Sequence, residues 1–404
     1  MFRSIAIVHL RPYVDTVPCL VSLANYLANN GYRIEIFTLS EDGFLKPHFE
    51  NANIQIHILL GAYTTHSLTV SLNMLTWYWH LLKQMSCKSY QCIIGVDPDG
   101  LFLATLLSLT TATPVVYHSL ELYFTDELKT VLKRVQKRLE GLCHRHATFA
   151  ITQDPDRAKL LAIENGIPLS TVMCLPNADL DYVQSKHNNF FHDLLTISSD
   201  QKIILHMGVL HDWAMPFELT ESTAAWPKDW TLVFHTRMKT SRDDRIVKEI
   251  EKRDHNNKVK FSLVPVKHQD LSAVASSADV GLAFYKRIEG PAMGKNIDHT
   301  GLSSGKIAQY LQNGVPIIIN ELPLISDIVR RYGCGISISK LSELQHAIKT
   351  VLDDHVNYCE NARRCYQEIY KPEHYLGSIL GRMNSLSPIS ALNKTSNENN
   401  GKLS

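Results

Sequence analysis

Short apolar runs alternate with helical patterns along most of this 404-residue chain, and the alternation begins at its first residues. Residues 4–10 form an apolar run, and residues 20–28 carry leucine and alanine at helical spacing. Gly31 ends that helix before a second apolar run at 34–39. A strand, a helix and a strand in this order form a βαβ unit, whose strands are parallel and are covered by helices. This feature predicts an α/β protein with doubly wound parallel sheets.

Two series of this kind follow one another, which suits a chain too long for a single ordinary core. The first continues with apolar runs at 54–60, 91–97, 113–118, 147–152 and 171–175. Residues 179–201 are polar and irregular, as is typical of a linker. The second series has its runs at 202–208, 230–235, 259–264, 279–285, 317–319 and 333–338. We therefore predict two Rossmann-like domains of similar size, followed by a disordered tail at 387–404.

Composition and charge are those of a globular protein, and we expect it in the cytoplasm. The chain is 45% hydrophobic and 20% charged, and its formal net charge of +1 gives no reason to expect a nucleic-acid partner. The N-terminal apolar run is too short for a signal peptide, and no run reaches the about 18 residues of a membrane span. The eight cysteines are scattered without a C-x-x-C pair, so we expect reduced thiols and no bound metal.

The stretch 300–319 predicts an anion site. It reads as a small-residue turn, a short helix and a buried strand, and the helix would begin at Ser303, Ser304, Gly305 and Lys306. At a helix N-terminus, unpaired backbone N–H groups and the positive end of the helix dipole favour an anion such as phosphate, and an ammonium adds charge. A serine-capped helix without a ligand is the alternative.

Glycine and basic residues follow the predicted strands of the second series. The carboxyl ends of parallel strands meet at one sheet edge, where α/β proteins bind ligands. A diphosphate needs several positive groups there, and a glycine lets the backbone approach it closely. The residues are Gly208, Arg237, Lys239, Lys286, Arg287 and Lys306. In the first series, His118 and Glu121 follow the strand at 113–118 in the same way.

Two helical stretches of the first half admit two interpretations. Residues 66–84 are rich in leucine and aromatic residues, and residues 128–145 combine an apolar face with six basic residues. One interpretation packs the apolar faces on the sheet and leaves the basic face in solvent. The other is an interfacial surface on anionic lipid, where each basic residue contributes about 1 kcal/mol.

Several ordered motifs resemble the retaining glycosyltransferases of family 4. Residues 115–123, VVYHSLELY, are similar to the family's VVYDSHELY segment, and residues 303–318, SSGKIAQYLQNGVPII, to its sp.K..EYla.G.PVi signature. Shorter likenesses lie at 150–154 (AITQD), 175–178 (LPNA), 206–208 (HMG) and 278–285 (ADVGLAFY). Their order and spacing together make the resemblance specific.

The resemblance implies the GT-B fold, in which two Rossmann-like domains face across a cleft. It implies an acceptor domain at 1–185, a nucleotide-sugar domain at 186–365, and a helix at 366–386 that packs back on the first domain. The implied reaction moves a sugar from a nucleotide-diphosphate sugar to a glycan, lipid-linked or other acceptor, in polysaccharide or glycoconjugate synthesis. No cofactor is expected beyond the donor, and the first domain's basic and aromatic surface would suit peripheral association with the inner face of an anionic membrane.

The resemblance also implies roles for single residues. Lys306, the helix start at 303–305 and Arg237 would assist departure of the diphosphate, while His118 and Glu121 would orient a sugar. Gly208, Lys239 and Lys286 would meet the donor as well.

The chain departs from the family where two glutamates are expected, because Gly301 and Gln309 occupy those positions. Gln309 can still hydrogen-bond ribose hydroxyls, without charge assistance. Gly301 offers no side chain, so that role is vacant or passes to Glu289, Asn296 or Asp298.

Three other functions stay open. A nucleotide-sugar epimerase of the same fold would also need the diphosphate site. A binding or scaffold protein that has lost catalysis would explain Gly301 and Gln309. A nicotinamide oxidoreductase is disfavoured, because residues 11–16 read RPYVDT where a G-x-G-x-x-G would follow the first strand.

Overall fold

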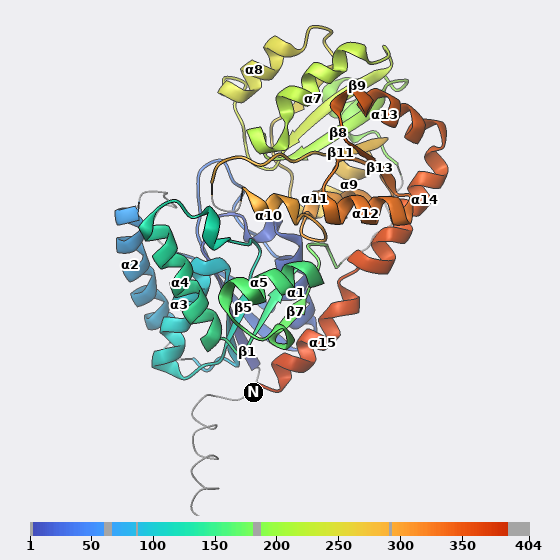
Figure 1. Ribbon diagram of the computed structural model, residues 1–404. Coiled ribbons are helices and arrows are strands. Elements are labelled where there is room, and N and C mark those ends of the chain that lie inside the picture. Colours follow the sequence, from blue (N-terminus) through green and yellow to red (C-terminus); the bar gives the residue numbers. More distant parts are fainter. Residues whose placement is uncertain (1–2, 60–66, 86–87, 181–186, 291–292, 387–404) are drawn as a thin grey trace, which may run out of the picture. The chain divides into compact units, whose positions relative to one another are not determined.

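The computed structural model describes residues 3–59, 67–85, 88–180, 187–290 and 293–386, and the account below concerns those residues. The chain forms two compact units. Of the described residues, those within 3–42, 46–176 and 372–386 form the N-terminal unit, and those within 43–45 and 177–371 form the C-terminal unit. Each unit has one sheet with helices on both of its faces (Figure 1).

A parallel sheet of seven strands lies at the centre of the N-terminal unit, in the order β3-β2-β1-β4-β5-β6-β7. The strands are β1 (Arg3–His9), β2 (Tyr32–Thr38), β3 (Ile54–Ile58), β4 (Cys92–Val96), β5 (Val115–His118), β6 (Phe149–Thr152) and β7 (Val172–Cys174). The register pairs Ile5 of β1 with Ile34 of β2 and with Cys92 of β4. The chain thus winds outward from β1 in both directions, which makes the sheet doubly wound.

The C-terminal unit repeats this plan with six parallel strands in the order β10-β9-β8-β11-β12-β13. The strands are β8 (Lys202–Gly208), β9 (Trp230–Thr236), β10 (Val259–Ser262), β11 (Val280–Ala283), β12 (Ile317–Asn320) and β13 (Gly335–Ile338). Here β8 lies between β9 and β11, so the winding direction reverses at β8.

Helices connect the strands in both units. Those of the N-terminal unit are α1 (Pro18–Asn29), α2 (Ser67–Met85), α3 (Asp97–Thr111), α4 (Val131–His146), α5 (Pro155–Asn165) and α15 (Glu373–Asn384). Those of the C-terminal unit are α6 (Phe190–Leu195), α7 (Pro216–Ser222), α8 (Arg245–Arg253), α9 (Leu271–Ser276), α10 (Lys295–Asp298), α11 (Gly305–Gln312), α12 (Pro323–Tyr332), α13 (Leu344–Asp353) and α14 (His355–Cys365). A π-helical turn, Tyr366–Tyr370, continues α14.

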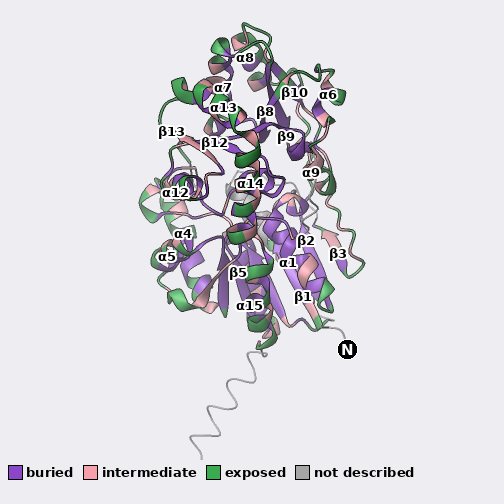
Figure 2. Cartoon of the chain, turned by 90° about the vertical axis from the view of Figure 1, so that its right-hand side faces the viewer, coloured by how far each residue is buried: buried purple, intermediate pink, exposed green. Residues whose placement is uncertain are grey.

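The strands are buried because helices cover both faces of each sheet. Every residue of β4 and of β9 is buried, and the strands are mostly purple in Figure 2. The continuous apolar runs of the sequence predicted strands that are apolar on both faces. The predicted α/β class, with two doubly wound parallel-sheet domains, is confirmed.

Several predicted boundaries differ from those of the structure. The units divide between Pro176 and Asn177, before the predicted boundary at 185. Asp97, the last residue of the predicted apolar run at 91–97, begins α3. Within the predicted helix at 366–386, α15 belongs to the N-terminal unit, where Arg3 and Tyr32 donate hydrogen bonds to Asn384 at 2.9 and 2.6 Å. The predicted tail at 387–404 lies outside the described residues.

Of the two interpretations of residues 128–145, the one that packs the apolar face on the sheet is wrong. Helix α4 buries Lys137, Glu140 and His144, and it exposes Val131 and Leu142. An amphipathic pattern defines two faces but does not state which of them meets the sheet. In α4 the polar face does.

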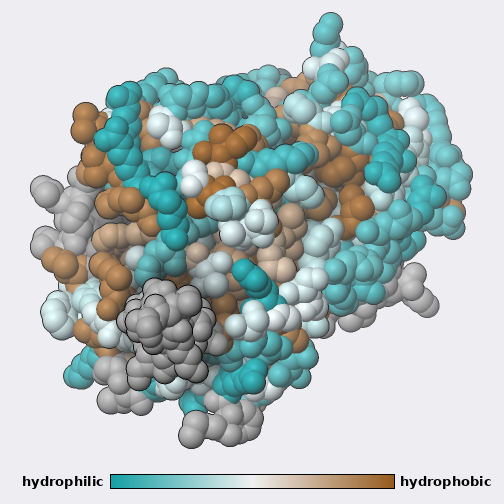
Figure 3. Space-filling model, turned by 60° about the horizontal axis from the view of Figure 1, so that its bottom comes forward, coloured by the Kyte–Doolittle hydropathy of each residue, from teal (hydrophilic) through white to brown (hydrophobic). Residues whose placement is uncertain are grey.

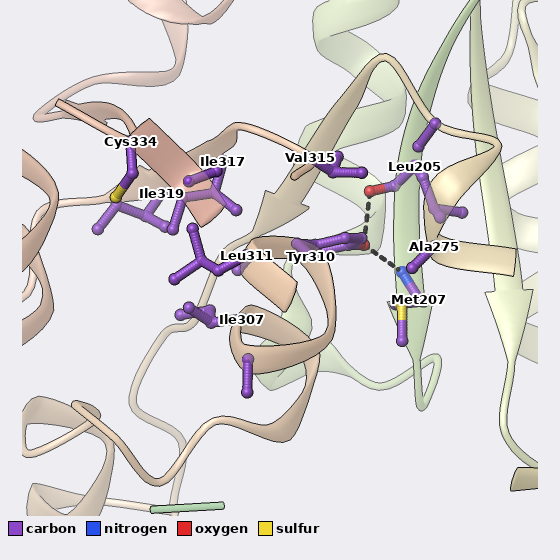
Figure 4. Close-up of a cluster of buried hydrophobic side chains, with 14 of the residues drawn as sticks. Leu205, Met207, Ala275, Ile307, Tyr310, Leu311, Val315, Ile317, Ile319 and Cys334 are labelled. Carbon is purple, nitrogen blue, oxygen red and sulfur yellow. Dashed lines mark hydrogen bonds between the residues drawn. The ribbon is translucent and has the colours of Figure 1, made fainter. Parts of the chain in front are cut away.

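Tyr310 connects α11 to β8, a central strand of its sheet, by hydrogen bonds. Tyr310 donates its hydroxyl hydrogen to the carbonyl oxygen of Leu205 (2.8 Å) and accepts from the amide of Met207 (3.0 Å), both in β8 (Figure 4). Its ring lies over Gly281 of β11, where an added Cβ would lie 2.6 Å from the ring carbons. The helix is therefore fixed to the neighbouring strands β8 and β11.

Removing this hydroxyl should destabilise the C-terminal unit. Tyr310→Phe keeps the buried ring but removes both hydrogen bonds of the hydroxyl to β8. Because the carbonyl of Leu205 and the amide of Met207 then lose a partner, we expect a loss of about 1–3 kcal/mol in the free energy of unfolding. Urea denaturation of the purified protein measures it. Tyr358→Phe, at a half-buried tyrosine of α14, is the matched control and should change stability by less. Equal losses in both variants would show that Tyr310 has no special role.

Candidate functional site

Helix α11 begins beside the end of β8. Ser304 caps the helix, because its Oγ accepts from the amide of Ile307 at 3.3 Å, and the hydroxyl of Tyr285 lies 2.6 Å from that Oγ. Gly208 ends β8 with a φ of 124°, which favours glycine, and a Cβ there would lie 3.6 Å from Nζ of Lys306. The structure thus brings together three predicted site features: the start of α11, Gly208 and Lys306.

Lys306 is partly buried between two rings and a histidine. Its Nζ is 3.4 Å from Nε2 of His206, 5.1 Å from the ring centre of Tyr285 and 5.7 Å from that of Trp213. Burial, together with the positive charge of Arg237, lowers the pKa of Lys306 to about 7. Burial and the charge of Lys306 hold the pKa of His206 well below its usual value, so this histidine is neutral. An anion bound beside Lys306 would favour its charged form.

Acidic neighbours engage two of the other predicted cations. Lys286 lies 2.6 Å from a carboxylate oxygen of Glu218, and the guanidinium of Arg287 forms an ion pair with Asp298. Lys239 is exposed. Arg237 follows β9 and acts electrostatically on Lys306. The predicted donor roles of Lys239, Lys286 and Asp298 remain predictions.

Gln309 lies on the second turn of α11, with only 4% of its surface exposed. Its amide nitrogen donates to a carboxylate oxygen of Asp179, whose other oxygen lies 2.9 Å from Nε2 of His268. Among the described residues, Oε1 of Gln309 has no hydrogen-bond partner. Asp179 was not predicted as a site residue, because it lies 130 residues before Gln309 and no local pattern links them.

Gly301 occupies the position of the other missing glutamate and contributes only backbone atoms. The carbonyl oxygen of Gly301 accepts a hydrogen bond from the hydroxyl of Tyr370 at 3.3 Å. Asn296, one of its predicted substitutes, is buried on α10 with 7% of its surface exposed. Its role at the site stays a prediction.

The predicted residues of the N-terminal unit lie at the end of β5, where His118 is the last residue, and in the segment after it. His118 is fully buried, with Nε2 3.8 Å from Sγ of Cys19, and burial lowers its pKa to about 3, so it is neutral. Glu121 lies partly exposed, three residues further along. Their predicted part in orienting a sugar stays a prediction.

Two further polar residues lie at this edge of the N-terminal sheet. Oδ1 of Asp97 accepts from the amides of Leu120 (2.9 Å) and Glu121 (3.3 Å). Burial, with the nearby charge of Glu121, raises the pKa of Asp97 to about 7. Arg157 is buried and donates to the carbonyl oxygen of Leu120 at 2.8 Å. Asp97 ends the apolar run at 91–97, a position where ligand-binding side chains occur in α/β proteins, whereas no motif includes Arg157.

The charge around α11 suits an anion. Around Lys306, a neutral imidazole lies next to the ammonium and the positive charge of Arg237 acts on it. Within the described parts of the chain, no three His, Cys, Asp or Glu side chains lie close enough to hold a metal ion.

Comparison with known families gives a match for each half of the chain. Residues 16–178 match the glycosyl transferase 4-like domain, and residues 223–380 match the glucosyltransferase 3-like C-terminal domain. No curated protein sequence matches the chain.

Solved structures share the fold over nearly the whole chain. Sucrose-phosphate synthase from Thermosynechococcus elongatus is 13% identical with a TM-score of 0.71, over 95% of this chain and 100% of that one. HepE of Anabaena in complex with UDP-glucose is 14% identical with a TM-score of 0.68, over 94% and 98%. WaaG, a glycosyltransferase involved in lipopolysaccharide biosynthesis, is 13% identical with a TM-score of 0.66, over 94% and 100%. At these identities the likeness shows the fold.

Two doubly wound parallel sheets with these structural neighbours define a protein of the GT-B class. With both family matches, the chain belongs to the group 1 glycosyltransferases. Its residues 16–178 form the glycosyl transferase 4-like domain. The predicted glycosyltransferase family is confirmed, while a retaining outcome stays a prediction.

Replacing Lys306 by methionine should stabilise the protein in a pH-dependent way. The lowered pKa of Lys306 means that the folded state binds fewer protons than the unfolded state between pH about 7 and the usual 10.5. Stability of the parent protein should therefore rise with pH through that window, and the Lys306→Met variant should lack this rise. At about pH 6 we expect the variant to be more stable by about 1–3 kcal/mol.

Thermal unfolding at a series of pH values measures the difference. Lys252→Met, at a lysine whose side chain is 74% exposed, is the control and should follow the parent protein. A stability difference between the Lys306 variant and the parent that stays constant with pH would contradict the desolvated state of this lysine.

Proposed function

We propose that this protein transfers a sugar from a nucleotide-diphosphate sugar to an acceptor, with the donor diphosphate at the start of α11. One observation carries the proposal: the desolvated Lys306 ammonium lies beside the N-terminus of α11 and the backbone of Gly208. Helix N–H groups, a glycine backbone and a cation are the groups that hold phosphates in proteins.

Electrostatics at this site would assist departure of the diphosphate. When the sugar leaves, negative charge grows on the phosphate oxygen that carried it. Donors already in place cost little reorganisation, and Lys306 and Arg237 would stabilise this charge more than that of the intact donor. Because the pKa of Lys306 is about 7, binding of the diphosphate would draw a proton onto it and complete the positive site. We propose a retaining reaction that needs no metal ion.

Gln309 would meet the ribose of the donor. Its amide nitrogen donates a hydrogen bond to Asp179. Its Oε1 can therefore accept a hydrogen bond from a ribose hydroxyl. HepE of Anabaena was solved with UDP-glucose, which supports a nucleotide sugar as donor here. For the acceptor we propose a glycan or lipid-linked molecule in polysaccharide or glycoconjugate synthesis, and for the compartment the cytoplasm.

A binding protein that has lost catalysis is the second candidate. It is favoured by Gly301, which leaves one expected acidic position without a side chain, and by the burial of Gln309 against Asp179. Such a protein would hold its ligand without turning it over.

Lys306→Ala tests the transferase directly. We expect kcat/KM to fall by about two orders of magnitude, the scale seen when one donor to a developing charge is removed. Turnover is measured by release of the nucleoside diphosphate from a panel of nucleotide sugars. Lys252→Ala on α8 is the control and should turn over normally. An active parent protein with unchanged turnover in the Lys306 variant would remove this residue from the mechanism.

Calorimetric titration with UDP and with GDP separates the two candidates. A transferase should bind one of them, and its affinity should fall by up to about tenfold per unit as pH rises above about 7, because Lys306 loses its charge. Lys306→Met should bind weakly at every pH. Nucleotide binding without turnover of any sugar donor would favour the binding protein, and binding of neither nucleotide would refute the diphosphate site.

A further inference from the structure

Helix α4 of the N-terminal unit presents its apolar side chains to solvent. Five valines and leucines form one stripe along the helix, since their positions fall within one third of its circumference at 3.6 residues per turn. Their exposed fractions are Val131 77%, Leu132 50%, Val135 43%, Leu139 40% and Leu142 57%. A surface helix normally turns such a stripe toward the core.

The opposite, polar face of α4 holds the helix in this orientation. Lys137 donates to Glu140 (3.0 Å) and to the side-chain oxygen of Asn165 on α5 (2.7 Å). Asn165 in turn donates to Glu140 (2.9 Å), which also accepts from the hydroxyl of Tyr117 on β5 (3.1 Å). Turning the leucines inward would break this buried network and leave charged groups unpaired, which is strongly unfavourable. The exposed stripe is therefore a fixed feature of the fold.

Basic side chains border the stripe on one side. Arg134, Arg138 and Arg145 are exposed and occur at spacings of four and seven residues, which places them in one row along the helix. Glu140 is the only acidic residue of α4, and it is buried in the network. The outer surface of α4 thus combines apolar and positive groups.

We propose that the outer face of α4 docks on the surface of an anionic lipid bilayer. The stripe would enter the boundary between head groups and acyl chains, while the arginine row would meet anionic head groups. Charge complementarity favours this occupant, because a second copy of α4 would bring the same positive charge against itself. In the part of the chain that the structure describes, no helix is long and apolar enough to cross a bilayer, so the contact would lie on the surface.

Neighbouring helices extend the apolar surface. Leu109 of α3 is 69% exposed, and Leu75 and Trp79 of α2 are 60% and 65% exposed. Helix α3 packs against both α2 and α4. Figure 3 shows hydrophobic side chains among hydrophilic ones along the left of the face it presents, the side on which α2, α3 and α4 lie in Figure 1. A tryptophan at a membrane surface is favourable because its ring is amphipathic.

Sedimentation of the full chain with lipid vesicles tests the proposal without any sugar donor or acceptor, so its outcome is independent of the proposed transferase activity. We expect binding to vesicles of phosphatidylcholine with phosphatidylglycerol, weaker binding to phosphatidylcholine alone, and release by salt. The double variant Val131→Asp/Leu142→Asp should lower the partition coefficient at least about tenfold. Arg138→Gln should lower it about fivefold, for one charge.

Val356→Asp, at a valine of α14 that is 71% exposed, is the matched control and should bind vesicles like the parent protein. All variants change exposed positions, and their circular dichroism and thermal unfolding should match the parent's. Absence of vesicle binding, or equal binding by the α4 variant and the parent, would overturn the proposal. So would a parent dimer in lipid-free solution that the α4 variant converts to a monomer, because a second copy would then cover the stripe.

Discussion

The contact of Tyr310 with β8 is the interaction on which the C-terminal site depends. An α11 helix that could slide or tilt would move its amide groups and Lys306 away from Gly208. The two hydrogen bonds of the Tyr310 hydroxyl fix the helix to the backbone of Leu205 and Met207, directly before that glycine. Strand, helix and glycine therefore act as one rigid frame, and the electrostatics of the site follow from it.

Desolvation makes this frame responsive to ligand. A lysine in water keeps its proton at neutral pH and gains little from a nearby anion, whereas Lys306 is close to the midpoint of its titration. The same burial that lowers the pKa of Lys306 strengthens the attraction of its ammonium to a phosphate, because the surrounding dielectric is low. His206 cannot share this charge, since its pKa lies far below neutrality. The positive charge of Arg237 also lowers the pKa of Lys306, and a bound anion would offset this effect.

The sequence predicted the parts of the molecule that local patterns determine. Apolar runs placed the strands of both sheets, and the small residues before Lys306 placed the start of α11, because strand and cap signals depend on neighbouring residues. It could not predict contacts between distant segments: the bond between Gln309 and Asp179, or the pairing of Lys286 with Glu218. Nor could it predict which face of α4 is buried, since that depends on Asn165 of α5 and Tyr117 of β5. The resemblance supplied the family, which periodicity alone would not have distinguished from other doubly wound proteins.

The ring of Tyr310 over Gly281 also limits how this protein can vary. Any side chain at 281 would meet the ring carbons, so an isolated substitution there would displace the helix and with it the site. A smaller residue at 310 would make room, but it would remove the hydroxyl that holds α11. Variation at the two positions is therefore coupled: in a set of related sequences, a larger residue at 281 should occur only with a replacement of the tyrosine. Such paired changes would mark relatives whose nucleotide site has been rebuilt.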